Sequence, residues 1–452
     1  MKPTLEEKVA ILLNRIQNED KAINSFITIN ENALGRAREI DKRIASKKSG
    51  KLAGYAISVK DSIAVAGMRC TAGSKMLENY VAPYDATAVE RIKAGDGLII
   101  GKTNMDQFSC GSSGETSYFG ATKNPLNNDL VPGGSSSGAA ASVAAGFCDM
   151  AIGGDTGGSI RCPASFCGLV GIKPTYGLVS RFGLIDMAMS LEQIGVIAKN
   201  VRDAALLLSV IAGQDSRDNA TKNAGKDYTK FCGKPVRGLK IGVSEELFSG
   251  CDKEVESCVK NAIDKLVALG AKKVPIKLES VKFAVSAYYL NVYAEFASAM
   301  QKYDGFKYGF RADDDNLVDC VSMSRSMALS LENKRRIILG TYITMKEFRE
   351  KWYSIALRAR EMIRKDFLGA LKKCDVIISP TMPFPPFRLG EKIEDPVAMY
   401  ASDVLTVSAN LSGVPAATVP SKKNKMIGVQ VMAKPFEEEK IFRVMSAYEK
   451  SG

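Results

Sequence analysis

The spacing of apolar residues along the chain predicts alternating helices and strands. A capping-box pattern at residues 4–7 opens an amphipathic helix, and a short apolar strand at 25–29 and a charged helix at 37–45 follow it. From residue 54 to residue 213 the chain is rich in Gly, Ala and Ser, and short apolar runs alternate with small-residue loops. We expect strands at 57–59 and 97–100, and a closely packed helix at 138–145.

The second half of the chain has longer helical patterns between two apolar runs. A polar stretch with glycines at 213–238 indicates either a linker or a surface excursion. The runs at 239–243 and 375–380 predict strands, and the segments 256–269 and 344–365 between them predict helices. Because strand and helix signals alternate throughout, the fold class that we expect is α/β.

Composition narrows the classes of protein. The chain has 452 residues, of which 46% are hydrophobic and 25% are charged, as in globular proteins with a large core. It contains no histidine, which excludes Ser-His-Asp and Cys-His hydrolases and every metal site that uses histidine ligands. Any acid–base chemistry near neutral pH must therefore use a lysine, a carboxylate, a tyrosine or a cysteine.

Charge and cysteine usage indicate the environment of the chain. The net charge of +12 is compatible with a polyanion such as RNA or with an acidic partner, although the basic residues are scattered. Ten cysteines without a Cys-x-x-Cys pair predict buried, reduced thiols and no metal site. No signal peptide is evident, and the apolar run at 204–213 is about half the roughly 20 residues that a membrane span needs. We expect a cytoplasmic protein that does not contact the membrane.

Three segments have a composition that suggests chemistry. In residues 54–61 an apolar strand ends on Lys60, followed by Asp61. Residues 132–138 read Pro-Gly-Gly-Ser-Ser-Ser-Gly, which fits a nucleophile elbow formally, but the elbow needs a histidine. The same segment lacks the Gly-Lys-Ser/Thr of a phosphate-binding loop, and a flexible turn before a helix explains it as well. Residues 153–161 hold four glycines before Ser159, so their N–H groups can converge on one anion.

Taken together, these segments can supply a nucleophile and a base. Ser159 could attack a carbonyl whose oxyanion the glycine loop stabilises. Its base could be Lys60, if burial lowers the lysine pKa by about three units, at about 4 kcal/mol. Ser135 could relay the proton between them. The alternative for Lys60 is an exposed strand end that pairs with Asp61.

The three motifs, in this order, resemble the amidase signature family. They read Gly-Tyr-x-Ile-x-Val-Lys-Asp, Gly-Gly-Ser-Ser-x-Gly and Asp-Thr-Gly-Gly-Ser-Ile-Arg, and the resemblance extends over residues 26–448. It implies a large mixed central β-sheet covered by helices on both faces. It also implies that Lys60 is the base, that Ser135 is a bridging serine preceded by a cis peptide, and that Ser159 is the acyl-forming nucleophile. The backbone of Thr156, Gly157, Gly158 and Ser159 would form the oxyanion hole.

Motifs in the second half are similar to the A subunits of tRNA-dependent amidotransferases, a branch of this family. They lie at residues 303–309, 334–341 and 400–415. The similarity implies that Arg336 binds the α-carboxylate of glutamine and that Asp403 binds its α-ammonium group. It also suggests that Tyr288 or Tyr289 lines the pocket, without distinguishing them. Residues 104–113 resemble a segment that forms the pocket, although Cys110 stands where bacterial relatives usually have Met.

The resemblance implies a complete domain plan and a reaction. One domain would span residues 1–452, with core motifs at 54–213, a helical excursion at about 244–370 and a return to the sheet at 375–452. The chain would hydrolyse glutamine and pass ammonia to subunits B and C, which amidate Glu-tRNA(Gln), Asp-tRNA(Asn) or both. This chain would need no cofactor, and ATP and Mg²⁺ would bind in a partner. The alternatives are a stand-alone amidase of the same family and a non-enzymatic basic adaptor.

Overall fold

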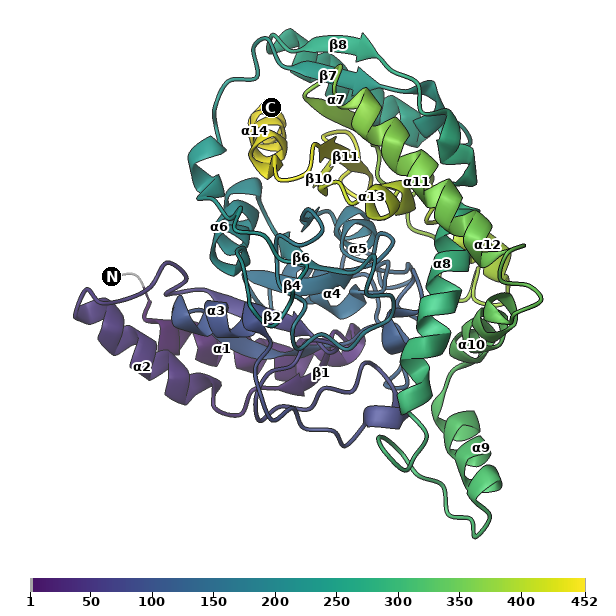
Figure 1. Ribbon diagram of the computed structural model, residues 1–452. Helices are drawn as coiled ribbons and strands as arrows, with labels where there is room; N and C mark the ends of the chain where they lie inside the picture. The colour runs from purple at the N-terminus through teal and green to yellow at the C-terminus, as the bar shows by residue number, and fades with distance from the viewer. Residues whose placement is uncertain (1–2, 452) are drawn as a thin grey trace.

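Eleven strands form one mixed sheet in the computed structural model, which describes residues 3–451. The sheet runs from β1, beside the N-terminal helices, to β7 and β8 at the top of the molecule (Figure 1). In sheet order the strands are β1 (Phe26–Ile29), β3 (Leu98–Thr103), β2 (Ala56–Lys60), β4 (Met150–Asp155), β6 (Gln193–Ala198), β5 (Val170–Lys173), β10 (Ala416–Pro420), β11 (Gly428–Ala433), β9 (Val376–Pro380), β7 (Lys240–Val243) and β8 (Lys272–Pro275).

Parallel and antiparallel pairs are combined in this sheet. Strand β2 is parallel to both β3 and β4, and β7 is parallel to both β8 and β9. The other neighbours are antiparallel. The α-helices of the described residues are α1 (Leu5–Glu19), α2 (Ala33–Ala45), α3 (Thr87–Ala94), α4 (Ser137–Ala144), α5 (Arg161–Phe166), α6 (Val201–Ile211), α7 (Lys253–Ala268), α8 (Ala284–Ala299), α9 (Leu317–Ala328), α10 (Leu331–Thr344), α11 (Tyr353–Ala370), α12 (Pro396–Ala401), α13 (Val407–Ser412) and α14 (Glu438–Glu449).

Side chains that alternate along the central strands divide between two cores. Ala56 and Ala151 face a core that α1, α2, α4 and α5 cover. Ile57 and Ile152, their neighbours on the same strands, face the larger core that α3, α6 and α14 cover. Because successive residues of a strand point to opposite faces, this division places helices on both sides of the sheet. The α/β fold with a large mixed sheet is therefore confirmed.

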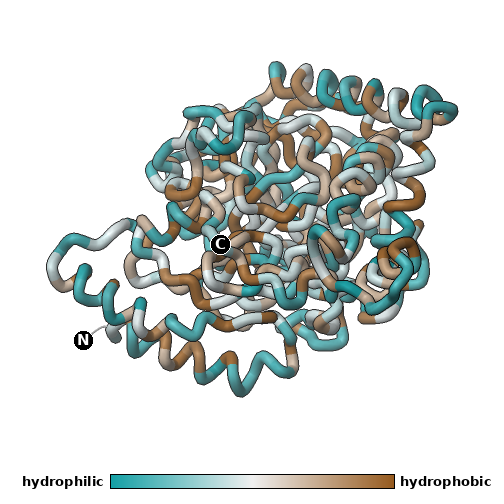
Figure 2. The backbone as a smooth tube through the Cα atoms, turned by 60° about the horizontal axis from the view of Figure 1, so that its bottom comes forward, coloured by the Kyte–Doolittle hydropathy of each residue, from teal (hydrophilic) through white to brown (hydrophobic). Residues whose placement is uncertain are grey.

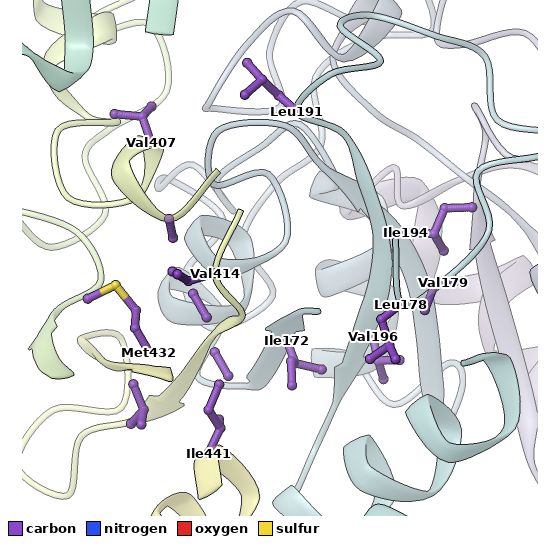
Figure 3. Close-up of a cluster of buried hydrophobic side chains, with 14 of the residues drawn as sticks. Ile172, Leu178, Val179, Leu191, Ile194, Val196, Val407, Val414, Met432 and Ile441 are labelled. Carbon is purple, nitrogen blue, oxygen red and sulfur yellow. The ribbon is translucent and has the colours of Figure 1, made fainter. Parts of the chain in front are cut away.

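The pairing of β5 with β10 joins the first half of the chain to its C-terminal part. Ile172 of β5 is opposite Ala417 of β10. Figure 3 shows Ile172 and Val196 in the same buried cluster as Met432 and Ile441, which come from β11 and α14. The core of the sheet therefore needs residues from both ends of the chain.

Peripheral helices are amphipathic, as the sequence predicts. Helix α1 begins with the expected capping box, in which Thr4 Oγ1 accepts from the Glu7 N–H at 3.1 Å and the Glu7 carboxylate accepts from the Thr4 N–H at 2.8 Å. Its apolar residues at positions 5, 9, 12 and 16 are buried. Figure 2 shows teal and brown turns alternating along the helices near the N-terminus, while much of the brown tube lies inside the molecule.

Two elements differ from the prediction. The helix that was expected at 344–365 begins only at Tyr353, because Met345 is extended and ends α10. The Thr344 hydroxyl, which donates to Gly340 O at 2.8 Å, marks this end. Strand β8 lies within the predicted helical excursion and was missed, because its sequence Lys-Lys-Val-Pro is mostly exposed at a sheet edge.

Other expectations are resolved more simply. The polar stretch at 213–238 is anchored to the core by Tyr228, whose buried ring packs on Phe442 of α14 with 5.5 Å between the ring centroids.

All ten cysteines are free, and eight of them are buried. No helix within residues 3–451 is long and apolar enough to cross a membrane.

Candidate active site

The three motifs meet at one edge of the sheet. Lys60 is the last residue of β2, and Ser159 lies in the loop between β4 and α5. Because β2 and β4 are parallel neighbours, their carboxyl ends lie side by side. Ser135 lies in the loop that leads into α4, a helix that packs against β2 and β4 (Figure 1). The order of the elements thus explains how residues 75 and 24 positions apart in sequence reach one place.

Lys60 and Ser135 are buried and in contact. The Lys60 Nζ lies 2.7 Å from Ser135 Oγ, and both side chains are at most 1% exposed. Burial lowers the pKa of Lys60 to about 8, because water is absent and the charged ammonium is disfavoured. A buried lysine is therefore what the structure shows, and the alternative of an exposed strand end paired with Asp61 is wrong; Asp61 pairs instead with Lys102.

Acidic groups around Lys60 oppose this effect. Glu192, Asp106 and Asp155 each raise the pKa of Lys60, in that order of strength. Burial raises the pKa of Glu192 to about 7, while its Oε2 accepts from the Met187 N–H at 2.9 Å. Burial outweighs the effect of these carboxylates, so Lys60 can lose its proton near neutral pH.

Ser159 lies close to the serine loop and is the most exposed of the three side chains. It is 9% exposed, and its carbonyl accepts from the Ser136 N–H at 3.1 Å. The peptide between Gly134 and Ser135 is cis, as the family resemblance implies. The backbone of the two loops is thus tied together beside Lys60, and Ser159 is the least buried of the three side chains.

Two glycines of the predicted oxyanion loop have no room for a side chain. A Cβ on Gly157 would lie 2.4 Å from the phenol oxygen of Tyr288. Gly158 has a φ of +138°, and a Cβ there would lie 2.5 Å from Thr406 Oγ1. The Thr406 hydroxyl also donates to Gly157 O at 2.5 Å. Side chains from distant parts of the chain therefore hold this loop in one conformation.

The N–H groups of this loop do not all point the same way. The Gly158 N–H donates to Asp155 Oδ1 at 2.9 Å, so it is already engaged, and its part in the oxyanion hole stays a prediction. Within residues 3–451, the N–H groups of Gly157 and Ser159 meet no protein acceptor. The Thr156 N–H likewise meets no acceptor among the described residues, so Thr156, Gly157 and Ser159 are better candidates for an oxyanion than Gly158.

A buried ion pair that the sequence analysis did not assign supports the loop. Arg161 contacts both oxygens of Asp155, at 3.0 Å and 2.9 Å, and neither side chain is exposed. Arg161 also donates to Thr406 O at 2.9 Å and to Gln430 Oε1 at 2.8 Å. Burial alone would raise the pKa of Asp155, but the charge of Arg161 holds it well below its usual range. The Asp-Thr-Gly-Gly-Ser-Ile-Arg motif contains both residues, so the signal was present in the sequence.

Asp403, the predicted ammonium ligand, is buried close to this loop. Its Oδ1 accepts from Ser112 Oγ at 2.8 Å, and its Oδ2 accepts from the Tyr289 hydroxyl at 2.7 Å. Burial raises the pKa of Asp403 to about 6, although these two bonds oppose the change. Asp403 is thus ionised at pH 7 and oriented by two donors; Ser112 lies in the predicted pocket segment 104–113, but its contact with Asp403 was not predicted.

Arg336, the predicted carboxylate ligand, is also buried. It is 4% exposed, and its Nε donates to Glu332 Oε1 at 2.7 Å. The guanidinium lies 5.4 Å from the ring centroid of Tyr289 and 5.9 Å from that of Tyr400. The charge of Arg336 also lowers the pKa of Asp403, so the predicted ligands of the two ends of glutamine lie in one electrostatic environment.

The two tyrosines that the sequence could not distinguish have different positions. Tyr288 packs on Gly157 of the oxyanion loop, whereas Tyr289 bonds to Asp403. Cys110 is buried next to this cluster, and burial raises the pKa of its thiol to about 12. The charge of Cys110, when ionised, would raise the pKa of both Arg336 and Lys60, so the thiol lies near both groups.

Metal ligands do not gather in this region. The part of the chain that the structure describes contains no group of three or more His, Cys, Asp or Glu side chains arranged to hold a metal ion. The polar groups of the site are instead Lys60, the arginines Arg161 and Arg336, several carboxylates and several hydroxyls.

Comparisons with known sequences identify relatives of this chain. The family model described as Amidase matches residues 7–442. The A subunit of the glutamyl-tRNA(Gln) amidotransferase of Methanosarcina mazei is 46% identical over 432 residues, which cover 95% of this chain and 90% of the relative. The protein of the same name from Thermodesulfovibrio yellowstonii is 46% identical over 451 residues, covering 98% and 93%.

Solved structures have the same fold. The A subunit of the glutamyl-tRNA(Gln) amidotransferase of Thermotoga maritima superposes with a TM-score of 0.83 at 37% identity, covering 99% of this chain and 94% of that one. The peptide amidase of Stenotrophomonas maltophilia has a TM-score of 0.83 at 28% identity, with the same coverage. This chain therefore belongs to the amidase family, together with the A subunits of glutamyl-tRNA(Gln) amidotransferases.

Proposed function

We propose that this chain is the glutamine-hydrolysing subunit of a tRNA-dependent amidotransferase. The observation that carries the proposal is the buried Lys60, 2.7 Å from Ser135 Oγ and beside the glycine loop that bears Ser159. A neutral lysine can replace the histidine that the chain lacks. The names of the relatives support the choice of glutamine and of a tRNA-linked reaction.

Hydrolysis begins with proton transfer away from Ser159. Ser159 Oγ attacks the side-chain amide carbon of glutamine as its proton passes to Ser135 Oγ, and the proton of Ser135 passes to Lys60 Nζ. The carbonyl oxygen becomes an oxyanion held by the N–H groups of Gly157 and Ser159, and each such donor contributes about 3–4 kcal/mol in the transition state. The proton then returns to the leaving nitrogen, which departs as ammonia. Water finally releases glutamate from the ester on Ser159.

Recognition of glutamine falls to the charged groups at the other end of the site. Arg336 takes the α-carboxylate, because a guanidinium binds a carboxylate through two parallel hydrogen bonds. Asp403 takes the α-ammonium group, and Tyr288 and Tyr289 form the wall beside them. A pocket with both charges selects a free amino acid over an apolar amide, which distinguishes this proposal from a stand-alone amidase.

The remaining steps belong to other chains. Ammonia passes to partner subunits B and C, which use ATP and Mg²⁺ to amidate Glu-tRNA(Gln), Asp-tRNA(Asn) or both. This chain itself supplies only the amidase site, and the net charge of +12 favours a complex that contains tRNA.

Ammonia release by the chain purified with its partner subunits tests the proposal. Ser159→Ala should abolish glutamine-dependent release, because the ester of the proposed mechanism forms on Ser159. Ser46→Ala, at an exposed position after α2, is the matched control and should leave the rate unchanged. Retained activity in Ser159→Ala would contradict the mechanism, and faster turnover of bulky apolar amides than of glutamine would contradict the substrate.

A further inference from the structure

Glu332 lies one turn before Arg336 on α10 and holds that arginine by its inner nitrogen. Its Oε1 accepts from Arg336 Nε at 2.7 Å and from the Tyr400 hydroxyl, also at 2.7 Å. Its Oε2 accepts from Arg335. Burial raises the pKa of Glu332, but the charge and hydrogen bond of Arg336 outweigh this effect, so the net pKa is lowered and the carboxylate is ionised.

This contact leaves the outer edge of the guanidinium without an acidic partner. Within residues 3–451, no oxygen accepts from either terminal nitrogen of Arg336, and the neighbour of Nη1 is Met187 Sδ at 3.9 Å. A guanidinium can bind two carboxylates at once only along different edges. Because Glu332 occupies Nε, the edge formed by Nη1 and Nη2 remains for a second carboxylate.

The same carboxylate is linked to Asp403, the proposed ligand of the α-ammonium group, through two aromatic rings. Tyr400, which donates to Glu332, stacks on Tyr289 with 3.9 Å between ring centroids. Tyr289 in turn donates to Asp403 at 2.7 Å. The positions of Arg336 and Asp403 are therefore connected by a continuous set of contacts that begins at Glu332.

We propose that Glu332 is a positioning residue for substrate recognition. It holds Arg336 by Nε, so that the outer edge of the guanidinium receives the α-carboxylate of glutamine. It also fixes the separation of Arg336 from Asp403 through the contact between Tyr400 and Tyr289. The inference rests on the proposed function of the site. Glu332 touches neither the reacting amide nor the proton relay, so it acts on the binding of one end of the substrate.

Kinetics on two substrates test this role in the complex with the partner subunits. The substrates are glutamine and 4-aminobutanamide, which keeps the amide and the ammonium group but lacks the carboxylate. In Glu332→Gln and Glu332→Ala, KM for glutamine should rise about 10- to 100-fold while kcat changes by less than about threefold. The kcat/KM for 4-aminobutanamide should stay within about threefold of wild type. Tyr400→Phe, which removes one donor, should raise KM for glutamine by less.

Glu361→Gln is the matched control, because Glu361 forms an exposed ion pair with Arg364 on α11. Loss of this pair should leave the kinetic constants for both substrates unchanged. Equal losses on both substrates, or an unchanged KM for glutamine, would overturn the role of Glu332. If Glu332→Ala fails to fold, the KM values of Glu332→Gln and Tyr400→Phe for glutamine still test the positioning role. Absence of glutamine turnover in the wild-type complex would overturn the proposed function itself, and the inference with it.

Discussion

A lysine that loses its proton near neutral pH destabilises the fold that contains it. Lys60 is completely buried, and no carboxylate lies within ion-pair distance of it among the described residues. Its pKa of about 8 records a compromise between burial, which favours the neutral amine, and the nearby carboxylates, which favour the ammonium. In the proposed mechanism, this single side chain therefore affects both the activity and the stability of the protein.

Activity should follow the protonation of Lys60. The kcat/KM for glutamine hydrolysis should rise about tenfold per pH unit below pH 8 and level off above it, because only the neutral amine accepts the serine proton. Below about pH 6 the slope should steepen, because Asp403 becomes protonated and no longer binds the α-ammonium group of glutamine. A pH–rate profile of ammonia release checks this. A profile that is flat between pH 6 and pH 8 would exclude Lys60 as the base.

The free energy of unfolding should also rise with pH, but over a higher range than the activity. The folded pKa of Lys60 is about 8 and the unfolded value is about 10.4, so the unfolded state binds this proton more tightly. The resulting loss of stability is fully present below pH 8 and disappears as the pH rises through 10.4. Lys60→Met should therefore be inactive, yet raise the unfolding free energy at pH 7 by about 1–3 kcal/mol.

Urea unfolding of the wild type and Lys60→Met at pH 7 and pH 10 provides the measurement. The difference between the two proteins should shrink at the higher pH. A variant less stable than the wild type at pH 7 would mean that the lysine stem contributes more by packing than its amine loses by burial.

At the scale of elements, the loop between β4 and α5 depends on the absence of side chains. Gly158→Ala places a Cβ against Thr406 in a backbone conformation that L residues rarely adopt. We expect kcat for glutamine to fall about 100-fold or more, because the donors at Gly157 and Ser159 shift. Gly369→Ala on α11 is the control, since nothing lies within 4 Å of its Cβ. It should leave kcat unchanged and raise stability by at most about 1 kcal/mol.

Much at this scale could be predicted from the sequence. Strands β2, β3, β7 and β9 have contiguous apolar runs, and helices such as α4 and α7 have clear patterns, so periodicity locates them. Strand β8 could not be found because a short, charged edge strand with a proline has no apolar alternation. The start of α11 was also misplaced, since the turns at 345–352 continue the polar pattern of the helix.

The site was predictable only where its residues are close in sequence. Lys60, Ser135 and Ser159 lie in compact motifs, and the structure places them together, although their roles stay predictions. Ser112 lies in the predicted pocket segment 104–113, but its contact with Asp403, 291 positions away, could not be predicted, and Glu332 has no signal of its own. Periodicity and spacing cannot identify contacts of this kind.

At the scale of the whole molecule, Arg161 connects the catalytic loop to the C-terminal part of the chain. Arg161→Met should lower the unfolding free energy by about 3–5 kcal/mol, because it leaves the buried carboxylate of Asp155 unpaired. The double variant Asp155→Asn/Arg161→Met should recover part of this loss, since no uncompensated charge remains. Urea unfolding of the four proteins of this cycle measures the effect. Additive losses would show that the two side chains do not act as a pair.

The mixed order of the strands predicts one cooperative unit. Because β5 pairs with β10, and β9 lies between β11 and β7, neither half of the chain can complete the sheet alone. Near-ultraviolet circular dichroism and enzyme activity should therefore be lost at the same urea concentration. Two separate transitions would contradict the expectation of a single domain over the chain.

The hydrogen bond from Arg161 to Gln430 and the close contact of Gly158 with Thr406 have a consequence while this chain itself is being synthesised. A nascent chain still bound to the ribosome contains the proposed nucleophile and the proposed base long before it contains the residues that hold the glycine loop in one conformation. Prematurely terminated products would thus carry every reactive group and remain unable to waste cellular glutamine.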